Sequence, residues 1–172
     1  LLLFIVLGFL LFVKLGDSHL TNWDEAWYAD IARNMLRSGD FLTPVWNRQP
    51  FFDKPPLYFW LSTFSFKLFG ISEFSARFVS ALSSVGVSIV LYLLATLLFN
   101  RRVGIISLVV LSSTIGFLYR ARTGNLDSLL TFLLLSSMYF FYLGFLKSRK
   151  WFVMMGITIA LTFLTKGMIA YI

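Results

Sequence analysis

Long apolar runs dominate this sequence and restrict the folds open to it. A helix needs about 20 apolar residues to cross the hydrocarbon of a bilayer, and within lipid every backbone polar group must be bonded inside the chain. The pattern therefore predicts an all-α fold, a polytopic transmembrane helical bundle that forms the N-terminal part of one larger domain. The expected spans are residues 1–16, 78–99, 103–119, 128–146 and 151–165, with another beginning at residue 168, and the first is expected to be cut short at its start.

The composition excludes several functions. Hydrophobic residues make up 58% of the 172 residues and charged residues 13%, whereas soluble domains are about 45–50% apolar and about 25% charged. The net charge of +7 comes from basic residues scattered between apolar runs, which offer no continuous stripe to nucleic acid. The chain has no cysteine and therefore no disulfide or thiolate metal site. Membrane lipids are the expected surroundings.

The charged residues divide between the two sides that alternating spans create. One side receives two short loops, residues 100–102 and 147–150, with five basic residues and no acid. Short loops rich in Lys and Arg stay in the cytoplasm, so the long loop over residues 17–77 is expected to face the periplasm. All eight acids fall on that second side, namely Asp17, Asp24, Glu25, Asp30, Asp40, Asp53, Glu73 and Asp127.

The long loop contains two predicted surface helices. The first covers residues 24–37, where Trp27, Ile31 and Met35 recur at helical spacing. This amphipathic pattern suits a helix that lies along the membrane surface. The second covers residues 56–69, after a Pro-Pro pair that can begin a helix but not lie inside one. Together they are expected to cap the membrane bundle.

Asp24 and Glu25 lie in the first turn of the first surface helix. Carboxylates there stabilise a helix by about 0.3–1 kcal/mol, and Thr21 with Asp24 has the spacing of a capping box. A purely structural role is therefore open for both acids. Because adjacent helical residues point about 100° apart, only one of them can easily face a given cleft.

Lys54 stands just before the second surface helix, where the helix dipole disfavours a cation. One interpretation is an exposed ion pair with Asp53, which would contribute only about 0–1 kcal/mol. The other is a phosphate ligand, with the lysine acting beside free helix N–H groups.

Arg120, Arg122 and Asp127 occupy a short turn between two spans, and Lys166 lies between two apolar runs. Arginines on the non-cytoplasmic side depart from the usual charge distribution, and ionisable residues at membrane depth are functional candidates. The cations therefore favour anion binding at this face. A capping role for Asn125 or Asp127 at the following span is the alternative.

The order of four motifs resembles a known family. DEAWYADIARNML is followed by SGD, FFDKPPLYFW and LFG-x-x-EFSARF, and Asp127 and Thr165-Lys166-Gly167 come later in the same order. The combination resembles membrane glycosyltransferases of the C-type fold, in the branch that holds the protein O-mannosyltransferases and the lipid A aminoarabinose transferase. The resemblance extends from about Asp24 to Gly167.

This resemblance implies a polyprenyl-phosphate sugar as donor, bound where the bundle meets the surface helices, and a lipid, glycan or protein acceptor. It implies that Asp24 is the catalytic acidic residue, Lys54 the lysine that neutralises the donor phosphate, and Asp127 the second acidic residue. Glu25, Arg120, Arg122 and Lys166 are further expected binding residues. Departures from the aminoarabinose enzymes occur at three positions, which are Trp27 in place of Arg, Asp53 in place of Glu and Ser128 in place of Pro.

The sequence thus predicts an integral membrane enzyme, most simply of the bacterial inner membrane, with its active site on the periplasmic side. Direct displacement at the anomeric carbon needs no obligatory cofactor or metal, although carboxylates facing a phosphate would suit a divalent cation. Two other hypotheses fit the same basic face. One is a transporter or flippase of lipid-linked sugars, and the other is a non-catalytic membrane scaffold.

Overall fold

The computed structural model describes residues 2–20 and 23–167, which are almost entirely helical. Thr21 of the expected capping box and the span expected from residue 168 lie outside these residues. The elements in chain order are α1 (Leu2–Phe12), α2 (Trp23–Ser38), β1 (Val45–Trp46), β2 (Gln49–Pro50), α3 (Leu57–Phe69), α4 (Glu73–Leu98), α5 (Arg101–Ser113), α6 (Ile115–Ala121), α7 (Leu126–Leu146) and α8 (Trp151–Lys166).

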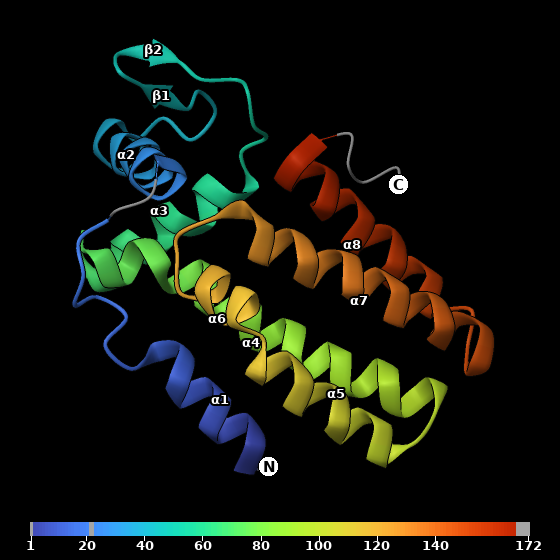
Figure 1. The fold of residues 1–172 in the computed structure, drawn as a ribbon. Helices are drawn as coiled ribbons and strands as arrows, with labels where there is room; N and C mark the ends of the chain where they lie inside the picture. The colour runs from blue at the N-terminus through green and yellow to red at the C-terminus, as the bar shows by residue number, and fades with distance from the viewer. Residues whose placement is uncertain (1, 21–22, 168–172) are drawn as a thin grey trace.

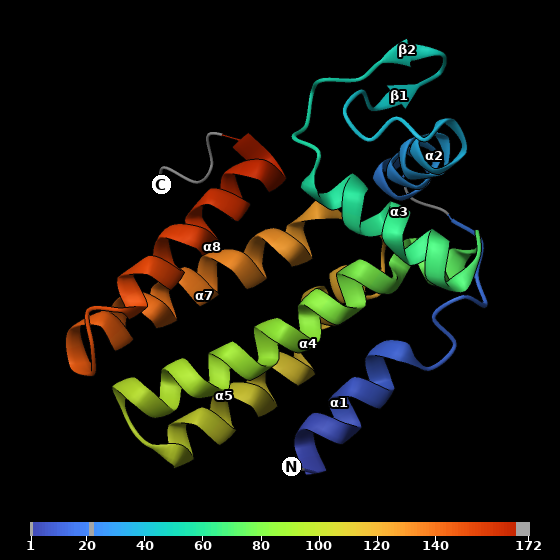
Figure 2. The same ribbon diagram turned by 180° about the vertical axis from the view of Figure 1, so that it is seen from behind.

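The long helices α4, α5, α7 and α8 run side by side, with α1 against α4 (Figures 1 and 2). Helices α2 and α3 and the β1–β2 hairpin gather at one end, which we call the capped end of the bundle. The short loops that join α4 to α5 and α7 to α8 lie at the other end. The predicted membrane-helix bundle with its cap of two helices is therefore the architecture observed.

Helices α4 and α7 are each long and apolar enough to cross a membrane. The run predicted as one span over residues 103–119 is instead broken into α5 and α6, which meet at an angle of 73°. The break falls at Thr114, after two serines, and the hydroxyls of all three bond to carbonyls of the preceding turn. Such bonds compete with the helical ladder and bend helices. The three hydroxyls give a local reason for the break.

Several helix boundaries differ from those expected. Helix α1 ends at Phe12, short of the residue 16 expected for the first span. Helix α4 begins at Glu73, earlier than the expected residue 78, because Ser72 and Ser75 form a reciprocal capping box. The short β1–β2 hairpin was not predicted from the sequence. Its turn is made by Asn47 and Arg48, both at positive φ, the conformation of a tight two-residue hairpin.

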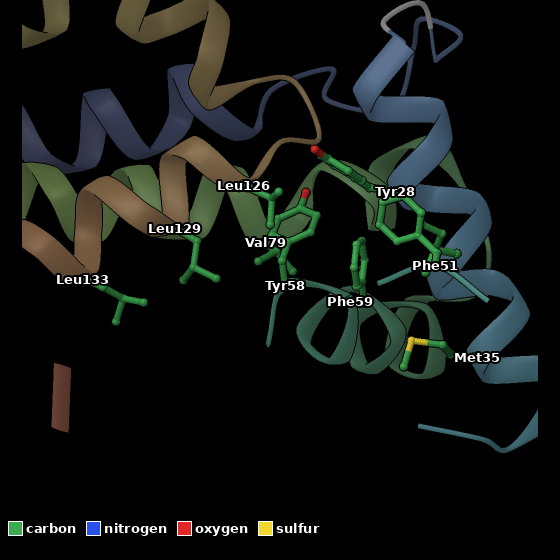
Figure 3. Packing of buried hydrophobic residues seen from close by; sticks show 10 residues of the cluster. Tyr28, Met35, Phe51, Tyr58, Phe59, Val79, Leu126, Leu129 and Leu133 are labelled. Carbon is green, nitrogen blue, oxygen red and sulfur yellow. The ribbon is translucent and has the colours of Figure 1, made fainter. Parts of the chain in front are cut away.

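The main core lies at the capped end and is rich in aromatic side chains. Tyr28, Ile31 and Met35 of α2 pack against Tyr58 and Phe59 of α3, with Phe51 beside them (Figure 3). Aromatic pairs of this kind contribute about 0.5–1.5 kcal/mol each beyond the area that they bury. The buried side of α2 therefore packs on protein, where the sequence analysis expected membrane surface. Val79, Leu126, Leu129 and Leu133 extend this core into the bundle.

Candidate active site

Asp24 and Glu25 are neighbours in the first turn of α2, but their side chains lie in different surroundings. The Glu25 side chain is 1% exposed and forms an ion pair with Arg77 of α4, whose side chain is 5% exposed. Asp24 is only partly buried. The helical turn thus directs one carboxylate into the protein and leaves the other accessible.

Arg77 uses its whole guanidinium group on protein atoms. Its Nε and Nη2 donate to the two carboxylate oxygens of Glu25 at 2.7 and 3.1 Å. Its Nη1 donates to the carbonyls of Leu15 and Ser18 at 2.8 and 2.9 Å, and Nη2 also donates to the carbonyl of His19 at 3.0 Å. We call this pair the Glu25–Arg77 brace. It ties α2 and α4 to the segment that follows α1.

The brace also holds the loop that leads into α7. The backbone N–H of Gly124 donates to Glu25 Oε1 at 2.8 Å, and a Cβ at Gly124 would come within 3.1 Å of the Ala76 carbonyl oxygen. This corrects the expectation that Glu25 binds substrate phosphate, because both of its oxygens accept bonds from protein donors. Sequence reasoning missed Arg77, although an arginine at the start of an apolar run was a usable signal.

The same loop is fixed by Asn125, which caps α7. Its side-chain oxygen accepts from the N–H of Ser128 at 3.1 Å. Its own N–H donates to the Ser80 hydroxyl at 2.9 Å, and that hydroxyl also lies 2.9 Å from the Asn125 carbonyl. The sequence left open whether Asn125 or Asp127 caps this helix, and the structure shows that Asn125 does. The Asp127 side chain is not used for capping.

Asp127 of α7 instead lies beside two cations, one from α8 and one from α6. Lys166 at the end of α8 donates to Asp127 Oδ1 at 2.7 Å, and Arg120 Nη1 of α6 lies 3.6 Å from Oδ2. The side chains of Asp127, Lys166 and Arg120 are 41%, 28% and 50% exposed. This open cluster carries one acid and two bases, so a net positive charge remains within it.

Tyr28 connects the two acidic residues of the predicted site. Figure 3 shows its ring directed from α2 towards Leu126 at the start of α7. Burial raises the pKa of the Tyr28 hydroxyl, the negative charges of Asp24 and Asp127 raise it in the same direction, and together they bring it to about 12. Both carboxylates therefore act on one phenol. Tyr28 was not singled out from the sequence, where it is one of seven tyrosines.

Lys54 and Lys166 line a single cavity of about 420 Å³ between the β2–α3 segment and the end of α8. Pro55, Pro56, Gly167 and the acid Asp53 also line it. Lys54 is partly buried and, within residues 2–20 and 23–167, has no carboxylate within ion-pair distance. The Asp53–Lys54 ion pair is therefore not formed among the described residues, and the phosphate-ligand interpretation stays a prediction.

Arg122 lies away from this cavity. Its Nη1 donates to the carbonyl of Leu10, and its Nη2 donates to the carbonyls of Val13 and Lys14 at 2.8 and 3.5 Å. The Leu10 and Val13 carbonyls lie at the end of α1, where a helix leaves carbonyls without intrahelical partners. The expectation that Arg122 binds the donor phosphate is thus corrected, because Arg122 caps the end of α1. Only Arg120 of the two arginines reaches Asp127.

No group of three or more His, Asp or Glu side chains within the described part of the chain is arranged to hold a metal ion. The expectation of a divalent cation therefore stays a prediction. Such a cation would be held jointly by carboxylates of the protein and a phosphate of the substrate.

Comparisons with known proteins find similar sequences and a similar fold. Residues 53–172 match the family described as dolichyl-phosphate-mannose-protein mannosyltransferase. An undecaprenyl phosphate-alpha-4-amino-4-deoxy-L-arabinose arabinosyl transferase of Yersinia pestis (strain Pestoides F) is 33% identical over 98% of this chain and 31% of the relative. A protein of Aquifex aeolicus (strain VF5) described as uncharacterized is 34% identical over 97% of this chain and 34% of that protein.

The fold is also similar to that of a solved structure. The crystal structure of ArnT from Cupriavidus metallidurans bound to undecaprenyl phosphate has a TM-score of 0.92 and 29% identity, over 99% of this chain and 33% of ArnT. The chain thus spans about a third of the length of the relatives it matches. These likenesses confirm the predicted all-α membrane fold and the resemblance to C-type-fold glycosyltransferases. With the apolar helices, they support an integral protein of the bacterial inner membrane.

Proposed function

The chain belongs to the dolichyl-phosphate-mannose-protein mannosyltransferase family, and on that premise we propose that the full-length protein is a membrane glycosyltransferase with a polyprenyl-phosphate sugar as donor. The observation that carries the proposal is the cavity at the capped end, where Lys54 and Lys166 lie together beside Asp127. Two lysines at the end of an apolar bundle suit a phosphate whose lipid chain extends into the membrane.

The charges of the site match the needs of sugar transfer. The acceptor oxygen forms a bond to the anomeric carbon while the bond to the donor phosphate breaks, and negative charge grows on the departing polyprenyl phosphate. Lys54, which has no carboxylate partner in the described residues, would stabilise that charge. Lys166 contributes less free charge because Asp127 lies 2.7 Å away.

Asp24 is the residue that we propose activates the acceptor. A hydroxyl acceptor must lose its proton as it attacks, and a carboxylate held near it can take that proton or orient the hydroxyl. Asp24 is partly exposed at the capped end. Its negative charge and the negative charge of Asp127 both raise the pKa of Tyr28. A phosphate acceptor would need no strong base, and Asp24 would then serve in positioning.

The acceptor and the orientation are also part of the proposal. The transferase relatives favour a lipid acceptor over a protein or a glycan. The loops at the end opposite the cap hold Arg101, Arg102, Lys147, Arg149 and Lys150. Because basic loops stay in the cytoplasm, the capped end would face the periplasm.

One observation favours a second candidate. The 73° break between α5 and α6 is a feature of transporters, which use discontinuous helices to form substrate sites. A transporter or flippase of lipid-linked sugars would bind the same donor at the same cations without breaking its glycosidic bond.

The experiment reconstitutes the full-length protein in liposomes with a polyprenyl-phosphate sugar and a lipid acceptor, and measures release of polyprenyl phosphate. Asp24→Asn is compared with wild type and with Lys67→Gln, which changes an exposed residue of α3. Sugar-dependent release that collapses only in Asp24→Asn supports the transferase. Movement of the lipid across the bilayer without release would instead establish the transporter.

A further inference from the structure

A second polar cavity lies on a different part of the capped end. It also measures about 420 Å³, and it is formed by the segment after α1 together with α6 and the residues that follow α6. It shares no lining residue with the cavity of Lys54. The polar residues around it are Lys14, Ser18, Arg77, Tyr119, Arg122 and Thr123.

The charge of this second cavity is positive. No acid lines it, and the positive charge of Arg77 is balanced by Glu25 within the brace. Arg122 is held against main-chain carbonyls, which accept its hydrogen bonds but carry no full charge. Lys14 is exposed and, in the part of the chain that the structure describes, has no carboxylate within ion-pair distance. Two cationic side chains therefore face this space without a neutralising acid.

The position of the cavity selects the kind of anion. Lys14 follows directly on the apolar helix α1, which has no charged residue along Leu2–Phe12. Ile115 and Leu118 of α6 also line the cavity, and Ile115 is 82% exposed. A ligand in this cavity thus meets both cationic and apolar side chains. This is the chemistry of a lipid headgroup at the membrane boundary, where each Lys or Arg contributes about 1 kcal/mol towards an anionic lipid.

We propose that this second cavity binds the phosphate group of an anionic membrane lipid, with Lys14 as its direct cationic contact, the positive charge of Arg122 nearby, and the acyl chains along Ile115 and Leu118. The phosphate oxygens would replace water around Lys14, the more accessible of the two cations. The site is separate from the proposed donor cavity and does not depend on the proposed transferase activity.

The test measures lipid binding to the full-length protein, purified in detergent and titrated with phosphatidylglycerol under native mass spectrometry. Lys14→Gln should weaken binding about fivefold, the change expected for one cation beside an anionic lipid. Lys14→Arg should restore it, because the charge returns. Lys67→Gln removes an exposed cation elsewhere at the capped end and should leave binding unchanged. Arg122 is left intact because its loss would also uncap α1.

The lipid source is tested in the same titration. Phosphatidylcholine, whose headgroup has no net charge, should bind more weakly and show no difference between wild type and Lys14→Gln. Millimolar inorganic phosphate should not displace phosphatidylglycerol. Equal affinity of wild type and Lys14→Gln for phosphatidylglycerol would overturn the site, and displacement by inorganic phosphate would assign the cavity to a free anion in place of a lipid.

Discussion

The capped end contains two clusters, and each of them combines acidic and basic side chains. The two clusters differ in burial and in the atoms that their basic side chains contact. The side chains of the Glu25–Arg77 brace are 1% and 5% exposed, and the guanidinium of Arg77 donates to oxygens of α2 and of the segment that follows α1. The open cluster of Asp127, Lys166 and Arg120 is 28–50% exposed. Burial makes the brace rigid at the cost of desolvating two charges. In the open cluster, a charged group of the substrate can replace one of the exposed ion-pair contacts.

The comparison also separates two adjacent acids. Glu25 belongs to the brace, and through Gly124 it fixes the loop that leads into α7, the helix whose first turn holds Asp127. Asp24, one residue earlier, remains accessible at the site. One turn of α2 therefore holds both the structural support and the proposed catalytic group, so substitutions at the two positions should have different consequences.

The largest effect on stability is expected for Arg77→Ala. It leaves the buried Glu25 carboxylate without its charged partner, and breaking a buried pair from one side costs about 3–5 kcal/mol of unfolding free energy. The control is Arg33→Ala, which removes the partly exposed partner of Asp30 on α2 and should cost at most about 1 kcal/mol. Chemical unfolding of the purified protein measures both.

A double substitution sharpens this prediction. Glu25→Met with Arg77→Met leaves no unpaired charge in the core and should recover part of the stability lost in Arg77→Ala. Equal losses in Arg77→Ala and Arg33→Ala would show that the brace contributes no more than a surface pair.

The second prediction concerns the cation of the donor cavity. Lys54→Ala should lower transfer about 100- to 1,000-fold, the range found when one group that stabilises transition-state charge is removed. Its unfolding midpoint should stay unchanged, because Lys54 is partly buried and has no ion pair in the described residues. Transfer is measured in liposomes, with Lys67→Ala as the control. Near-normal turnover in Lys54→Ala would remove this lysine from the site.

The sequence was sufficient to predict the fold, but not the individual side-chain contacts. Long apolar runs have few physical solutions in lipid, so the helical bundle followed directly from them. The break at Thr114 was hidden because hydropathy does not register serine and threonine hydroxyls that bond back to the helix.

The site shows a similar division between local and distant information. Motif order singled out Asp24, Lys54, Asp127 and Lys166, but the partner of Glu25 is 52 residues away in the sequence. The roles of Arg120 and Arg122 also diverge over two residues, because one faces Asp127 and the other the end of α1. No spacing rule distinguishes them, since the difference depends on how α6 packs against α1.

The third prediction measures coupling within the open cluster. Because Asp127 and Lys166 are 41% and 28% exposed, solvent screens their attraction, and a double-mutant cycle of Asp127→Asn and Lys166→Gln should give a coupling of at most about 1 kcal/mol in unfolding free energy. The same cycle on Glu25 and Arg77 should give a larger value. Equal couplings would remove the distinction between the brace and the open cluster.

The smallest effect is expected for Asp24→Asn at alkaline pH. It concerns Asp24, the accessible one of the two adjacent acids in α2. Tyr28 has a folded pKa of about 12 against a reference value of 10.0. Its contribution to stability is therefore complete below about pH 10 and is lost as the pH rises through about 12, because the folded state holds the proton more tightly than the unfolded state in that window. Asp24→Asn removes one of the charges that raise this pKa and should narrow the window. Absorbance of tyrosinate, with Tyr28→Phe subtracted, measures the shift, and an unchanged pKa in Asp24→Asn would show that the Asp24 carboxylate does not act on this phenol.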